Sequence, residues 1–235
     1  MGELNEAVPE TVRRRLALSL DTDDLVAALR LGASLRPWFG VAKIGLELFS
    51  AAGPEAIGAL REQGYQVFLD LKLFDIPSTV NRAGRVLGAL GVEYLTLHAT
   101  GGVEMLKAGV EGLYTGAEQA GLEVPMALAV TVLTSDDSAP SHIVPNRVRV
   151  ALEGGCGGLI LAASDLQTAH ELAPRMFRVV PGIRLAGGPV HDQARSATPQ
   201  QAAANGADLL VIGRAVTASD DPMATAAAIA SAIAD

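Results

Sequence analysis

Eight apolar, strand-like runs alternate with helix-like segments along the chain, and this alternation constrains the fold more than any other feature of the sequence. The runs cover residues 16–21, 41–45, 67–72, 94–98, 126–132, 158–162, 179–182 and 209–213. Strands that alternate with helices form βαβ units and hence a parallel sheet. Eight such units predict a closed (β/α)8 barrel, the TIM barrel, with the helices on its outside.

The helix-like segments between the runs are rich in alanine and leucine and have helical periodicity. They cover residues 23–30, 54–63, 80–90, 103–119, 147–152, 165–172, 200–204 and 222–234. No linker or low-complexity tract interrupts the 235 residues, so we expect one barrel domain over residues 1–235. The alternative is a doubly wound open sheet, which the regular count of eight and the lack of a G-x-G-x-x-G after the first strand both disfavour.

The chain carries a formal net charge of −8, which argues against a nucleic-acid partner and against an anionic membrane surface. An anionic substrate therefore requires a local cationic pocket. No apolar run approaches the ~20 residues that span a bilayer, and residues 1–15 lack the apolar core of a signal peptide. The single cysteine, Cys156, allows no intrachain disulfide, and we expect it to be a buried structural thiol in a cytoplasmic protein.

The stretch from Phe68 to Thr79 places charged residues at the end of an apolar strand. Asp70 and Lys72 are two positions apart, so strict alternation predicts that their side chains share one face. Burying an unpaired charge is costly, so these groups must pair, reach water or meet a ligand. A carboxylate next to an ammonium group can disfavour a bound anion at one point and offer a proton at the next.

Further polar residues stand at the ends of other predicted strands, where (β/α)8 barrels hold their active sites. They are Asp21, Lys43, His98, Thr131 with Thr134, Arg184 and Arg214. Some have a plain structural alternative, because Asp21 can cap a helix and Lys43 can extend its charge to water. For His98 we favour a satisfied interior histidine. Together the array predicts an active site, and because the four histidines lack metal-ligand spacing, no metal is expected.

Glycine and arginine recur after the seventh and eighth predicted strands, in Pro181-Gly182-Ile183-Arg184 and in Gly213-Arg214. The loops at these two places often hold a phosphate in this kind of barrel. Glycine lets the backbone approach the anion, and the fork of an arginine matches phosphate oxygens. We therefore predict a phosphate site there. Residues 185–193 are a candidate lid that brings Gln193 to the phosphate, and the alternative is a surface loop without a role.

These elements resemble the orotidine 5′-phosphate decarboxylase family in its bacterial form. The resemblance extends from Asp21 to Arg214 and so covers almost the whole chain. Its motifs are Ala42-Lys43-Ile44-Gly45, Asp70-x-Lys72-x-x-Asp75-Ile76-Pro77-x-Thr79, Leu133-Thr134-Ser135, Pro181-Gly182-Ile183-Arg184 with Asp192-Gln193-x-Arg195, and Val211-Ile212-Gly213-Arg214. Related sugar-phosphate barrels share the D-x-K-x-x-D core, and the other motifs make the match specific.

The resemblance implies decarboxylation of orotidine 5′-monophosphate to uridine 5′-monophosphate, the last step of pyrimidine nucleotide synthesis, without a metal or an organic cofactor. It implies that Lys72 donates the proton and that Asp70 lies beside the substrate carboxylate, in a charge network completed by Lys43 and Asp75. It also implies a homodimer in which Asp75, Ile76 and Thr79 reach into the neighbouring subunit's site. The implied nucleotide contacts are Asp21 and Lys43 to the ribose, Thr134 to the pyrimidine, and Arg184, Gln193, Gly213 and Arg214 on the phosphate side.

One position departs from the family pattern. Leu185 follows Arg184 where many relatives have a proline, so the stiffness of the lid in those relatives cannot be assumed for this chain.

Two rival functions are left open. One is a metal-dependent sugar-phosphate decarboxylase or aldolase of a related barrel, which the extra cation Lys43 disfavours. The other is a non-catalytic nucleotide-binding barrel, against which the complete charged set argues.

Overall fold

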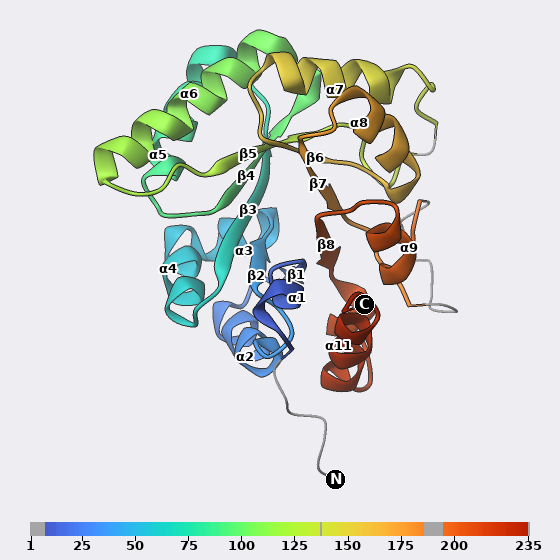
Figure 1. Ribbon diagram of the computed structural model, residues 1–235. Helices are drawn as coiled ribbons and strands as arrows, with labels where there is room; N and C mark the ends of the chain where they lie inside the picture. Colours follow the sequence, from blue (N-terminus) through green and yellow to red (C-terminus); the bar gives the residue numbers. More distant parts are fainter. Residues whose placement is uncertain (1–7, 137, 186–194, 235) are drawn as a thin grey trace.

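The computed structural model describes residues 8–136, 138–185 and 195–234 (Figure 1). Eight parallel strands close into a barrel in chain order, with β8 paired to β1. They are β1 Leu16–Leu20, β2 Val41–Ile44, β3 Gln66–Leu73, β4 Tyr94–His98, β5 Met126–Val130, β6 Gly158–Ile160, β7 Phe177–Val180 and β8 Leu209–Ile212. Each predicted run overlaps one of these strands, and the predicted (β/α)8 barrel is confirmed.

Helices connect the successive strands around the outside of the barrel (Figure 1). They are α1 Glu10–Arg13, α2 Leu25–Leu35, α3 Leu46–Ala52, α4 Pro54–Glu62, α5 Pro77–Gly88, α6 Gly102–Ala120, α7 Ile143–Glu153, α8 Leu166–Leu172, α9 Pro199–Ala204, α10 Arg214–Thr217 and α11 Pro222–Ser231, with 3-10 turns η1 Ala99–Gly101 and η2 Ala163–Asp165. The short helices α1, α3 and α10, of four, seven and four residues, were not predicted, since a helix of two turns or fewer gives at most a weak helical period. In the described part of the chain, no helix is both long and apolar enough to cross a membrane.

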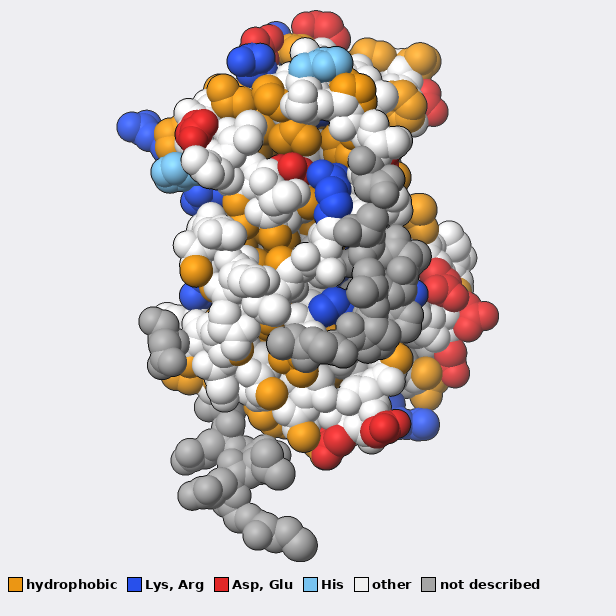
Figure 2. Space-filling model, turned by 90° about the vertical axis from the view of Figure 1, so that its right-hand side faces the viewer, with side chains coloured by type: hydrophobic (Ala, Val, Ile, Leu, Met, Phe, Trp, Pro, Cys, Tyr) orange, Lys and Arg blue, Asp and Glu red, His pale blue; other side chains and the backbone are white. Residues whose placement is uncertain are grey.

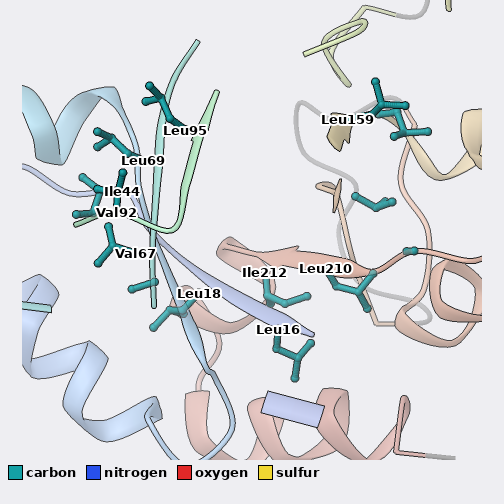
Figure 3. Packing of buried hydrophobic residues seen from close by; sticks show 14 of the residues in the cluster. Leu16, Leu18, Ile44, Val67, Leu69, Val92, Leu95, Leu159, Leu210 and Ile212 are labelled. Carbon is teal, nitrogen blue, oxygen red and sulfur yellow. The ribbon is translucent and has the colours of Figure 1, made fainter. Parts of the chain in front are cut away.

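The buried apolar side chains form two layers, one between strands and helices and one inside the barrel. Outward-facing residues such as Leu16, Leu18 and Leu69 belong to the outer layer (Figure 3). Inward-facing residues such as Val41 and Phe68 belong to the inner one. Successive side chains of a strand point to opposite faces, so a strand buried on both faces reads as one continuous apolar run. This double burial is why the eight strands are visible in the sequence.

The single cysteine, Cys156, lies between α7 and β6. It is a free thiol and only 6% exposed. Burial raises the pKa of this thiol to about 12, so the group stays protonated at neutral pH. The prediction of a buried structural thiol is confirmed.

Helices α5 and α6 pack against each other along a row of glycines. A Cβ atom added at Gly116 would collide with the carbonyl oxygen of Arg85, and one added at Gly112 would collide with that of Asn81. The two helix backbones therefore meet at points where only glycine leaves room. This contact fixes the position of α5, which follows directly on the Asp75 loop.

Replacing Gly116 with alanine is expected to lower the free energy of unfolding by about 2 kcal/mol, because the added methyl group overpacks the α5–α6 contact. Urea unfolding measures the change. Gly58 in α4 is the matched control, since a Cβ there meets nothing within 4 Å. Gly58→Ala should raise stability by roughly 0.5–1 kcal/mol, the helix preference of alanine over glycine. A Gly116→Ala variant as stable as Gly58→Ala would contradict the close packing.

Candidate active site

A cavity of about 830 Å³, including its open mouth, lies at the carboxyl ends of the strands. One side of its wall is polar and charged, with Ser19, Asp21, Lys43, Asp70 and Lys72 from the β1–β3 half of the barrel. Apolar side chains form much of the remaining wall, and the loops after β7 and β8 add Arg184 and Arg214; the apolar residues are Phe68, Val130, Val132, Leu133, Ile160, Pro181 and Val211. Figure 2 shows basic and hydrophobic side chains toward the middle of one face, with most acidic ones nearer its margins. A bound molecule would thus meet charged side chains at the ends of β1–β3, apolar side chains, and arginines after β7 and β8.

The charged side chains occupy the last inward-facing positions of the first strands. Lys43 follows Val41 by two positions, and Asp70 follows Phe68 by two, where both apolar residues belong to the layer inside the barrel. Strand pairing places Ser19 opposite Lys43. The same alternation that fills the barrel with apolar side chains therefore delivers polar ones to its mouth.

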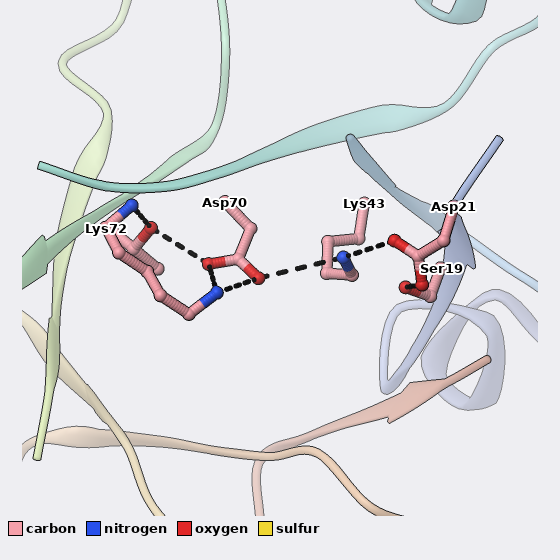
Figure 4. Close-up of polar contacts among 6 residues, drawn as sticks. Ser19, Asp21, Lys43, Asp70 and Lys72 are labelled. Carbon is pink, nitrogen blue, oxygen red and sulfur yellow. Dashed lines mark hydrogen bonds and ion pairs between the residues drawn. The ribbon is translucent and has the colours of Figure 1, made fainter. Parts of the chain in front are cut away.

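These side chains form a continuous chain of hydrogen bonds and ion pairs across the mouth (Figure 4). The hydroxyl of Ser19 donates to Asp21 at 2.7 Å, and Lys43 Nζ lies 3.1 Å from Asp21 Oδ1. Lys43 Nζ also lies 3.6 Å from Asp70 Oδ2. Lys72 Nζ donates to both carboxylate oxygens of Asp70 at 2.9 Å. Carboxylates and ammonium groups therefore alternate from Asp21 to Lys72.

The backbone at Lys72 is left-handed, with a φ of +50°, and no other non-glycine residue in the described ranges has a positive φ. The pairing of β3 with β4 shifts register between Leu69 and Leu73, so the strand is irregular at this point. Asp70 and Lys72 both line the cavity, so their side chains lie on one side of the strand as predicted, although the strand between them is irregular. Such backbone conformations cost about 1–3 kcal/mol and cluster at functional sites.

Asp70 lies between the two lysines of this chain of charges, which consists of Asp21, Lys43, Asp70 and Lys72. Burial raises the pKa of this carboxyl, but Lys43 and Lys72, together with hydrogen bonds from Lys72 and Thr96, hold it below its ordinary value. Asp70 is therefore ionised at neutral pH. Because the folded-state pKa is depressed, the stability that these contacts contribute is present above the ordinary carboxyl pKa of about 4. It is lost as the pH falls through the folded-state value.

The predicted phosphate side also lies at the cavity. Gly182, Arg184, Gly213 and Arg214 all line it. Gly182 has a φ of +80°, which glycine adopts without strain, and Arg184 is 8% exposed. The predicted contact Gln193 lies outside the described residues.

Three of the predicted residues do not line the cavity of their own chain. Asp75 and Ile76 lie on the connection between β3 and α5, and Thr79 lies in the first turn of α5. Ile76 is 63% exposed. The carboxylate of Asp75 accepts a hydrogen bond from the backbone N–H of Ile76 at 2.6 Å and does not reach the chain of charges. Thr134, in contrast, lines the cavity together with Asp21.

His98 is half-buried at the end of β4 and does not belong to the cavity lining. Its Nδ1 accepts a hydrogen bond from the backbone N–H of Thr100 at 3.3 Å. Burial, and then the nearby charges of Arg147 and Lys72, lower the pKa of the imidazole below its ordinary value. The ring is therefore neutral at pH 7, in agreement with the preferred interpretation of a satisfied histidine.

Two hydroxyl residues complete the chain of charges without having been selected from the sequence. Ser19 bonds Asp21, and the hydroxyl of Thr96 donates to Asp70 at 3.0 Å. Both lie two positions before a polar residue at a strand end, Asp21 and His98 respectively. Counting two residues back along each strand from these polar residues would have found Ser19 and Thr96.

Arg195 joins three segments near the mouth. Its guanidinium donates to Asp165 at 2.8 Å and to the carbonyl oxygen of Leu133 at 3.2 Å. Leu133 immediately precedes Thr134, so Arg195 fixes the loop that carries the predicted pyrimidine contact. The sequence shows Arg195 as part of a motif, but these partners are distant in the chain and only the fold reveals them.

In the described residues, no group of three or more histidine, cysteine or acidic side chains is placed to hold a metal ion. The two carboxylates in the cavity, Asp21 and Asp70, each bond a lysine. A closed (β/α)8 barrel with ionic groups alternating at its mouth and arginines on the opposite loops defines a barrel enzyme with a site for a small anionic substrate.

Comparisons with known proteins identify the family. The family model described as "Orotidine 5'-phosphate decarboxylase / HUMPS family" matches residues 14–229, and the chain belongs to this family. An orotidine 5′-phosphate decarboxylase of Anaeromyxobacter sp. (strain K) is 41% identical, over 93% of this chain and 98% of the relative. One of Moorella thermoacetica is 38% identical, over 98% and 96% of the two chains. The crystal structure of the decarboxylase from Lactobacillus acidophilus is similar with a TM-score of 0.79 and 34% identity, covering 94% of this chain and 99% of the other.

Proposed function

We propose that the protein decarboxylates orotidine 5′-monophosphate to uridine 5′-monophosphate, the last step of pyrimidine nucleotide synthesis. The observation that carries this proposal is the Lys72 ammonium group, held by both oxygens of Asp70 in a cavity that also contains apolar side chains, Arg184 and Arg214. The names of relatives that are about 40% identical over most of their length support it. The related metal-dependent sugar-phosphate enzymes fit less well, because Lys43 bonds both cavity carboxylates.

The reaction breaks the bond between C6 of the pyrimidine and its carboxylate carbon. The carboxylate leaves as CO2, and the bonding electron pair stays on C6. The Lys72 ammonium group next to C6 stabilises this charge by roughly 4 kcal/mol at ~4 Å and an effective dielectric near 20. Lys72 then transfers a proton to C6, which completes uridine 5′-monophosphate and leaves a neutral amine that solvent reprotonates.

A single contact of this size does not account for a large acceleration, so the remainder comes from positioning and from stabilisation realised in the transition state. Asp70 keeps the Lys72 ammonium group oriented, and its own charge lies near the departing carboxylate. Repulsion between the two carboxylates is relieved as CO2 leaves. The same carboxylate thus orients the proton donor and favours loss of the product gas.

The remaining cavity residues bind the nucleotide. Asp21 and Lys43 contact the ribose hydroxyls. Thr134, which lines the cavity, contacts the pyrimidine. The phosphate-side set is Arg184, Gln193, Gly213 and Arg214. The phosphate is remote from C6, and binding energy from such a remote group offsets the cost of orienting and desolvating the reacting part.

The active form in this proposal is a homodimer of one-domain chains, each spanning residues 1–235. Asp75, Ile76 and Thr79 would extend from each subunit into the partner's cavity. The exposed positions of Asp75 and Ile76, and the absence of all three residues from the cavity lining of their own chain, support this arrangement. The 61% exposed ring of Phe74 beside them offers apolar surface for the contact.

An assay with a chelator tests the proposed function. Purified protein is treated with EDTA and mixed with orotidine 5′-monophosphate at neutral pH, and the loss of the orotate absorbance is followed. We expect conversion to uridine 5′-monophosphate at the same rate with EDTA and with added Mg²⁺. Conversion that requires added metal would favour the rival metal-dependent class. A folded protein that binds the nucleotide without converting it would favour the non-catalytic alternative.

A further inference from the structure

Thr96 lies in the middle of β4 at the point where β3 is irregular. Its side chain is completely buried. Strand pairing joins Leu69 to Leu95 and then Leu73 to Leu97, so the irregular part of β3 falls opposite Thr96. The extra residues of such an irregularity lose their regular ladder partners, and their buried N–H groups need other acceptors.

The Thr96 hydroxyl supplies that acceptor. The backbone N–H of Lys72 donates to Thr96 Oγ1 at 2.8 Å, and the same hydroxyl donates to Asp70 Oδ1 at 3.0 Å. The direction of both bonds is fixed by chemistry, since an amide N–H only donates and an ionised carboxylate only accepts. The one proton of the hydroxyl is therefore directed at Asp70, and its lone pair is directed at Lys72.

We propose that Thr96 is a positioning residue that holds the left-handed backbone of Lys72 and orients the Asp70 carboxylate toward the Lys72 ammonium group. The inference rests on the proposed function only where kcat with orotidine 5′-monophosphate is the measured quantity. Thr96 does not line the cavity, so it acts through the two residues that do. One hydroxyl thereby sets both ends of the ion pair, the backbone of the proton donor and the carboxylate that orients it.

The φ of +50° at Lys72 makes this support necessary. A non-glycine residue in this region costs about 1–3 kcal/mol and persists where its surroundings impose it. The side-chain bond from Lys72 to Asp70 is one restraint, and the backbone bond to Thr96 is the other. Without the hydroxyl, the backbone N–H of Lys72 loses its hydrogen-bond acceptor. The backbone of β3 at Lys72 then lowers its free energy by relaxing toward an ordinary strand conformation.

Three variants separate this role from a general effect on stability. Thr96→Val keeps the shape of the side chain and removes both hydrogen bonds, whereas Thr96→Ser keeps the hydroxyl. The matched control is Thr131→Val. Thr131 is also buried and follows the neighbouring strand β5, but the structure does not place it in the cavity lining. Its hydroxyl donates to the carbonyl oxygen of Ile160 at 2.9 Å, outside the chain of charges. Each variant is assayed for kcat with orotidine 5′-monophosphate and for its affinity for uridine 5′-monophosphate by calorimetry.

We expect Thr96→Val to lower kcat by roughly 100-fold, the size of effect that a small misplacement of a reacting group produces. Its affinity for the product nucleotide should change by less than about threefold, because the ribose and phosphate contacts are untouched. Thr96→Ser should stay within about fivefold of the parent kcat and Thr131→Val within about threefold, by the same logic. If Thr96→Val does not fold, Thr96→Ala replaces it with the same expectation.

Several results would overturn the inference. They are a kcat of Thr96→Val within threefold of the parent, an equal loss in Thr96→Ser, or an equal loss in Thr131→Val. A parent enzyme without any turnover would instead contradict the proposed function. The crystal structure of Thr96→Val then decides the inference by itself, because Lys72 should leave its positive φ, and an unchanged Lys72 backbone would refute the role of Thr96.

Discussion

Replacing Lys72 with alanine is expected to lower kcat by at least roughly 10⁴-fold, because it removes the proton donor and the positive charge in one step. The structure places the Lys72 ammonium group inside the cavity, bonded to both oxygens of Asp70. No other lysine replaces it, since Lys43 is already bonded to Asp21 and Asp70. The loss of the orotate absorbance under saturating substrate measures the effect.

The variant should keep its fold. The positive φ of +50° costs alanine about the same backbone free energy as it costs lysine. Asp70 also retains its contacts with Lys43 and Thr96. Lys107 is the control, as the one lysine of the chain outside the cavity, 57% exposed on α6 beside Glu104. Lys107→Ala should leave kcat unchanged. A Lys72→Ala enzyme within tenfold of the parent would rule Lys72 out as the proton donor.

The strands were predictable because the barrel buries them on both faces. Continuous apolar runs mark β1 and β2 within one residue of their observed ends. Helix boundaries were less accurate, because α5 begins at Pro77 and the helical period becomes visible only from Val80. Pro77 at the first helical position was a sequence signal for the true start of the helix.

The site was predictable where strand geometry is regular. Lys43 and Asp70 lie at inward-facing positions two residues beyond an apolar one, so counting along the strand finds them. Lys72 is different, because the irregularity in β3 depends on its register with β4, and a tertiary pairing leaves no local mark. The position of Thr96, two residues before His98, could have been found by the same counting, but its bonds to Lys72 and Asp70 join two strands and depend on their register.

The position of Asp75 leads to a second prediction with a large effect. Mixing two inactive variants, Lys72→Ala and Asp75→Asn, is expected to restore activity. Asp75 lies outside the cavity that its own chain forms around Lys72. If each site takes Asp75 from the partner subunit, Lys72→Ala and Asp75→Asn inactivate a site from opposite chains. A mixed dimer then has one site with both defects and one site with none. After random exchange of equal amounts, about a quarter of the parent activity should appear, and turnover is measured with subunit exchange verified by mass spectrometry.

The double variant Lys72→Ala/Asp75→Asn, mixed with the parent, is the reciprocal control. With shared sites, each mixed dimer contains no intact site, because its one Lys72 faces the altered Asp75 of the partner. The parent should therefore lose about half of its activity on mixing. With sites built from one chain, the two single variants would gain nothing on mixing, and the parent would lose nothing. The two experiments change activity in opposite directions, so an unspecific effect of dilution or dimer dissociation cannot imitate both results.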